Sequence, residues 1–77
     1  MVSAYILIQA EAGQAARVAR EIATIKGVGS AEDVTGPYDV IVRAEAPSLD
    51  VLAKLVVRMI QDVGGVTRTL TCPVIHL

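Results

Sequence analysis

The chain opens with a regular alternation of apolar and less apolar side chains. In Val2–Ala10 (VSAYILIQA), every second residue has a purely apolar side chain. A period of two predicts a β-strand. The opposite face is not purely polar, because it carries Tyr5 and Leu7, and a strand that is apolar on both sides is usually covered on both sides. The apolar face consists of Val2, Ala4, Ile6 and Ile8.

Two later segments have the period of a helix. From Gly13, apolar residues recur at three- and four-residue steps until Lys26 and Gly27, which supply a basic last turn and a glycine stop. A second helix is predicted after Ser48, which can cap it, and ends at Gly64. The expected buried stripes are Ala15, Val18, Ala19, Ile22 and Ile25 in the first helix, and Leu49, Leu52, Ala53, Val56, Met59 or Ile60, and Val63 in the second.

Three further strands are predicted at residues 28–34, 39–44 and 66–75, the first two joined by turn residues. In the last strand, we expect Thr67, Thr69 and Thr71 on one face and Val66, Arg68, Leu70 and Cys72 on the other. The order β-α-β-β-α-β predicts a ferredoxin-like α+β fold, with both helices on one face of a four-stranded antiparallel sheet. The other face would be bare in a single chain, and Tyr5, Leu7 and Ile41 are candidates to lie on it.

Composition indicates that the chain associates. Seventy-seven residues allow one domain, and a core this small rarely suffices without a supplement. With one cysteine and one histidine, neither disulfides nor a metal can stabilise it, whereas 53% of the residues are hydrophobic. No apolar run approaches the roughly 20 residues of a membrane span, and no signal peptide is recognisable. We therefore expect a cytoplasmic protein that buries its surplus apolar surface against copies of itself.

The sequence offers little catalytic chemistry. A net charge of −1 and two aromatic residues argue against direct nucleic-acid binding. Cys72 and His76 stand four positions apart on a strand end, about 13 Å when extended, which is too far for a thiol–imidazole pair. Neither a metal-ligand set nor a phosphate-binding loop is present. We predict no catalytic residue, no metal and no cofactor.

The segment 35–39 (TGPYD) has the most chemical character. It can be interpreted either as a plain β-turn or as the lip of a small-ligand site. In the second interpretation, Asp39 offers a carboxylate to an ammonium, Gly36 lets backbone amides approach, and Tyr38 walls the pocket. The threonines of the last strand have the same two interpretations, as a solvated strand face or as hydroxyl partners of a ligand.

Four segments together resemble the ligand-binding (RAM) domain of the Lrp/AsnC family of amino-acid-responsive regulators. They are the first strand VSAYILIQA, the helix stop Lys26-Gly27-Val28, the turn TGPYDVIV and the stretch GGVTRTLT. The resemblance covers the whole chain, 1–77, as a single domain, and the helix-turn-helix domain of full-length members has no counterpart in it. Pro37 departs from the residues commoner at its place in that loop. The resemblance implies ligand-binding roles for Gly36, Pro37, Tyr38, Asp39, Thr69 and Thr71.

The resemblance also implies an assembly. Family members form dimers that pair their sheets into an α+β barrel, here through Tyr5, Leu7 and Ile41, and the dimers join into octamers or similar rings. Amino-acid effectors bind at the subunit contacts, and full-length regulators of the family are among the implied partners. We therefore predict a non-enzymatic sensor module that modulates transcription or a partner protein. Two alternatives stay open: a small dimeric α+β barrel enzyme of the monooxygenase or isomerase kind, and an oligomerisation scaffold without ligand.

Overall fold

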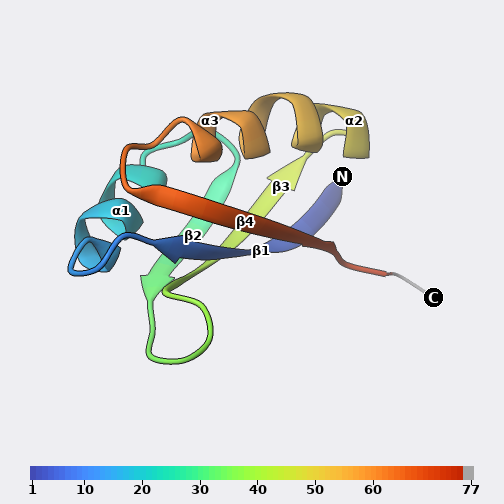
Figure 1. Ribbon diagram of the computed structural model, residues 1–77. Helices are drawn as coiled ribbons and strands as arrows, with labels where there is room; N and C mark the ends of the chain where they lie inside the picture. The colour runs from blue at the N-terminus through green and yellow to red at the C-terminus, as the bar shows by residue number, and fades with distance from the viewer. Residues whose placement is uncertain (76–77) are drawn as a thin grey trace.

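The computed structural model describes residues 1–75 as one layer of helices on one sheet (Figure 1). The strand and helix order is the predicted β-α-β-β-α-β, with the second helix divided into three consecutive segments. The elements are β1 (Val2–Ala10), α1 (Ala15–Ile22), β2 (Val28–Asp33), β3 (Val40–Ala46), α2 (Leu49–Val51), η1 (Leu52–Val57), α3 (Arg58–Gln61) and β4 (Val66–Pro73).

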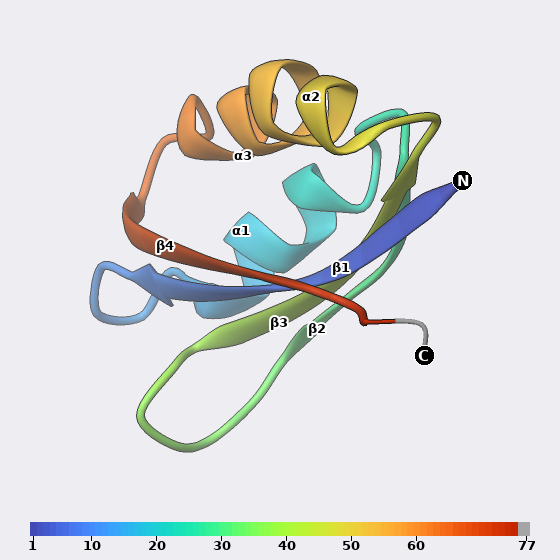
Figure 2. The same cartoon turned by 90° about the vertical axis from the view of Figure 1, so that its right-hand side faces the viewer.

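The sheet has four strands in the order β2-β3-β1-β4, and all neighbours are antiparallel. Figure 2 shows the helices together above the sheet, while the loop between β2 and β3 extends to the other side. A four-stranded antiparallel sheet with both helices on one face is the ferredoxin-like arrangement. The predicted fold class is therefore confirmed.

The core lies between the sheet and the helices. The even-numbered residues of β1 and β3 point into it, and Ile6, Ile8, Val40 and Val42 are fully buried there. The predicted buried residues Val18, Ala19, Ile22 and Ile25 all belong to this cluster, although α1 ends at Ile22, earlier than the predicted stop at Lys26-Gly27, and Ile25 lies in the turn that follows. The alternation of the strands and the period of the helix thus direct their apolar residues into one common core.

The second helix differs from its predicted pattern. Its residues Leu52–Val57 form a π-helix, in which the hydrogen bond spans five residues instead of four. The wider turn places Leu52, Val56 and Ile60 in the core at four-residue steps. Leu49 and Ala53, expected on the buried stripe, are exposed instead, and of the predicted pair Met59 or Ile60 it is Ile60 that is buried.

The last strand also departs from the predicted alternation. The register with β1 shifts between Gln9 and Ala10, so that Ala10 pairs with Val66 while Gln9 pairs with Arg68. A bulge of this kind moves the residue before it to the other side of the sheet. Val66 consequently packs against the core instead of sharing a face with Arg68.

Candidate ligand-binding site at one end of the sheet

The loop between β2 and β3 is held by backbone hydrogen bonds at its base. The Val34 amide donates to the Asp39 carbonyl at 2.8 Å, and the Asp39 amide donates to the Ile8 carbonyl of β1 at 2.8 Å. Gly36 at the tip has a φ of +155°, and nothing lies within 4 Å of the place of a Cβ. Backbone conformation, not crowding, therefore favours glycine there.

Asp39 fastens the loop to the first strand. Its Oδ2 accepts a hydrogen bond from the backbone amide of Ala10 at 2.8 Å. The carboxylate thus takes the place of a ladder partner at the end of β1, and a charged acceptor makes this bond stronger than a neutral one. Asp39 therefore stabilises the loop, independently of any role in ligand binding.

Gln9 links the loop to the fourth strand and was not predicted as a site residue. Its side-chain Nε2 donates to the Pro37 carbonyl at 3.3 Å, and its carbonyl accepts from Thr67 Oγ1 at 3.1 Å. Sequence alternation placed Gln9 on the face with Tyr5 and Leu7, but its long-range contacts carry no local signal. The residues of the loop, β1 and β4 are therefore connected at this end of the sheet.

The threonines of β4 point toward the helices. Thr69 and Thr71 are in register with the buried residues Ile8 and Ile6, and Gln61 Nε2 of α3 donates to Thr69 Oγ1 at 3.1 Å. The loop, in contrast, leaves the sheet on the side away from the helices (Figures 1 and 2). Within one chain, β1 separates the two threonines from the predicted residues Gly36, Pro37, Tyr38 and Asp39.

The helix-free face of the sheet is the surface formed by Tyr5, Leu7, Ile41, Arg43, Leu70 and Cys72. Tyr5, Ile41 and Leu70 are 44%, 38% and 47% exposed, and Leu7 is half-buried among them. Leu7 stands opposite Ile41 on one side and Leu70 on the other. The expectation that Tyr5, Leu7 and Ile41 share one bare face is confirmed, and Leu70 extends it.

Arg43 and Tyr5 form the polar part of this face. The Arg43 guanidinium lies 5.2 Å from the centre of the Tyr5 ring, and its Nη1 donates to Tyr5 Oη at 2.8 Å. A cation over an aromatic ring is attracted by the ring quadrupole. A depression of about 370 Å³ beside this pair is lined by Tyr5, Ser30, Glu32, Val34, Ile41 and Arg43.

A larger apolar groove lies at the opposite end of the sheet from the loop. Its volume is about 670 Å³, and its lining includes Met1, Val28, Pro47, Leu55 and Met59. It gathers the start of β1, the start of β2, the end of β3 and the outer side of η1. No local pattern in the sequence predicts this groove, because its lining residues come from separate elements.

The remaining chemistry of the described residues is sparse. Cys72 is exposed beside Tyr5. His76, which was predicted to lie too far from Cys72 for a thiol–imidazole pair, is outside the described residues. Over residues 1–75, His, Cys, Asp and Glu side chains do not gather into a metal-binding group. In the same range, the helices are too short or too polar to cross a membrane.

Comparison with known proteins identifies the class. The family model described as the Lrp/AsnC ligand binding domain matches residues 3–76. A crystal structure of TTHA0845 from Thermus thermophilus has a TM-score of 0.90 and 27% identity, covering 100% of this chain and 96% of that one. FFRP-DM1 has a TM-score of 0.88 and 31% identity, covering 97% of this chain and all of that one. Among curated proteins, none matches significantly.

AsnC of E. coli shares the fold at a TM-score of 0.87 and 21% identity, and this chain spans 52% of its length. Fold and comparisons together define a regulatory ligand-binding domain. The chain belongs to the Lrp/AsnC ligand-binding domain family, because the family model covers nearly all of it.

Proposed function

We propose that this domain, residues 1–77, is an oligomeric sensor that binds an amino-acid effector at its subunit contacts. It would transmit the signal to transcription or to a partner protein without binding DNA itself. The observation that carries the proposal is the family match over residues 3–76, which includes the 34–39 loop and β4. A net charge of −1 gives the chain no electrostatic footprint for nucleic acid.

The first assembly contact is a second copy on the helix-free face. Tyr5, Leu7, Ile41 and Leu70 form an apolar surface at the centre of a face that the helices leave open. A patch of this kind usually marks an interface, and a stable interface buries about 800 Å² per partner. Two sheets paired in this way make the α+β barrel of the dimer.

The effector site is shared between copies. On one chain, Thr69 and Thr71 lie on the helix side of β4, and β1 separates them from the loop. A ligand that uses both sets of residues therefore needs the loop of one copy beside β4 of another. This requirement favours assembly of dimers into an octamer or similar ring, and it would let full-length Lrp/AsnC-type regulators join the same contacts.

Thermal unfolding with each of the twenty amino acids tests the sensor role. A ligand at a hundredfold excess over its dissociation constant stabilises the folded state by about 2.7 kcal/mol. For a chain of this size, that corresponds to a Tm increase of roughly 10–20 °C. Light scattering of the same samples measures the assembly.

A Tm increase with one or a few amino acids supports sensing. Assembly without any Tm change across the panel would leave an oligomerisation scaffold as the better description. A monomer with no Tm change would contradict both parts of the proposal.

A further inference from the structure

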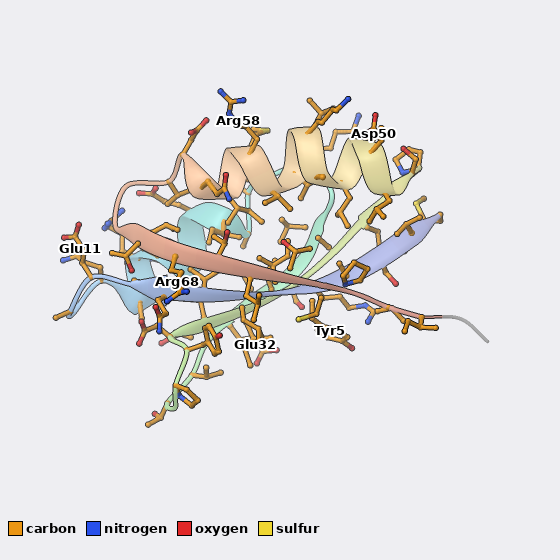
Figure 3. All side chains as sticks on the ribbon, turned by 45° about the vertical axis from the view of Figure 1, so that its right-hand side comes forward. Tyr5, Glu11, Glu32, Asp50, Arg58 and Arg68 are labelled. Atoms are coloured by element: carbon orange, nitrogen blue, oxygen red, sulfur yellow. The ribbon has the colours of Figure 1, made fainter. Side chains whose placement is uncertain are left out.

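The fourth strand presents a basic residue toward the loop side of the sheet. Arg68 stands between Thr67 and Thr69 and is in register with Gln9, as Leu70 is with Leu7. Figure 3 shows the labelled Arg68 side chain on the side of the sheet away from the helix that carries Asp50 and Arg58. Arg68, and not the neighbouring threonines, is therefore the polar residue of β4 on the side where the loop extends.

Gln9 connects Arg68 with the loop. It lies beside Arg68 on β1, and its Nε2 reaches the Pro37 carbonyl at 3.3 Å. Adjacent strands are about 4.8 Å apart, so Arg68 is roughly two strand spacings from the start of β3. The Asp39 carboxylate lies at that start, against the Ala10 amide. A positive and a negative group thus flank Gln9.

Three of the six residues in the 34–39 loop have no backbone amide hydrogen to offer an anion. Pro37 has no amide hydrogen. The amides of Val34 and Asp39 already donate within the fold, to the Asp39 and Ile8 carbonyls. A carboxylate placed beside the loop would also face the like charge of Asp39, which opposes its binding unless a cation compensates.

We propose that Arg68 binds the carboxylate of the effector. A guanidinium offers a planar fork of donors that matches a carboxylate, and such charged hydrogen bonds are among the strong ones. In the described residues, Arg17 and Lys54 form ion pairs with Glu21 and Asp50, whereas Arg68, like the other four basic side chains, enters none. The inference rests on the proposed sensor function and names the residue that holds the carboxylate of its ligand.

Calorimetric titration of an Arg68→Gln variant tests the assignment. The probes are each amino acid that stabilises the wild type, its primary amide, its decarboxylated amine, and a set of short-chain carboxylates. We expect Arg68→Gln to weaken amino-acid binding by roughly 10- to 100-fold, the range for one charged hydrogen bond. Arg68→Lys keeps the charge without the planar fork of donors, so its affinity for the amino acid should lie between those of the wild type and Arg68→Gln. Arg58→Gln, an exposed arginine on the helix, is the matched control.

The amide and the amine discriminate the role of Arg68. They should bind weakly, and equally to wild type and Arg68→Gln, because neither carries a carboxylate. Unchanged amino-acid affinity in Arg68→Gln would overturn the inference, as would loss of assembly in that variant without ligand. If short-chain carboxylates bind through Arg68 and no amino acid binds, the inference stands and the sensor proposal fails. If neither class binds the wild type, both fail.

Discussion

Replacing Gly27 with alanine tests how closely the second helix approaches the sheet. Gly27 has a φ of +98°, and a Cβ there would lie 2.9 Å from Val56 Cγ2 and 3.0 Å from the Glu45 carbonyl oxygen. The Glu45 amide also donates to the Gly27 carbonyl at 2.7 Å. The backbone at this turn is therefore held on the β3 side and crowded on the η1 side.

The expected cost has two parts. A side chain in the left-handed region costs about 1–2 kcal/mol, and forcing an extra methyl group into a packed site costs about 1–3 kcal/mol. Gly13→Ala is the matched control, because Gly13 has a φ of +78° but nothing within 4 Å of its Cβ position. Gly13→Ala should therefore incur only the cost of the left-handed backbone conformation.

Thermal and urea unfolding at one protein concentration measure both variants, since the proposed assembly would make Tm depend on concentration. At about 4–8 °C per kcal/mol, Gly27→Ala should lower Tm by roughly 10 °C or more, and Gly13→Ala by less than half as much. Equal losses in the two variants would refute the reasoning, because the crowding by Val56 and Glu45 would then contribute nothing.

Two further changes probe the face and the loop. Leu70→Glu should convert the assembly to smaller species in light scattering, since it puts a charge into the proposed sheet-to-sheet contact. The control Leu49→Glu changes a helix residue that is 52% exposed, and it should leave the assembly size unchanged. Equal behaviour of the two variants would argue against this contact. Asp39→Ala leaves the Ala10 amide without its 2.8 Å partner and should lower the free energy of unfolding by about 1–3 kcal/mol in urea titrations. The exposed Asp33→Ala should cost much less, and a comparable loss there would contradict the anchoring role of Asp39.

Alternation was sufficient to predict the strands because one face of this sheet is buried. The bounds of β1 agree with the prediction at both ends, and its apolar face is the core face. β3 begins one residue later than predicted, at Val40, because the Asp39 amide bonds to Ile8 outside the regular ladder. Such end effects depend on a partner strand distant in sequence.

The second helix and the candidate site could be predicted only in part. A π-helical turn uses the same residue types as an α-helix, so nothing local distinguished Ile60 from Met59 as the buried residue. Alternation on β4 correctly separated Thr69 from Arg68, but it could not say which of them faces the helices. That choice follows from the register with β1, and it decides which side chain a ligand beside the loop can meet.

The position of Cys72 provides a chemical reporter of assembly. It is the chain's single cysteine, it is exposed, and it stands opposite Tyr5 on the helix-free face. A thiol reagent can therefore reach the sulfur when that face is open, whereas a second sheet packed over it would slow the reaction. The labelling rate of the unmodified protein, followed as its concentration is raised, thus measures how much of the face is covered without introducing a probe.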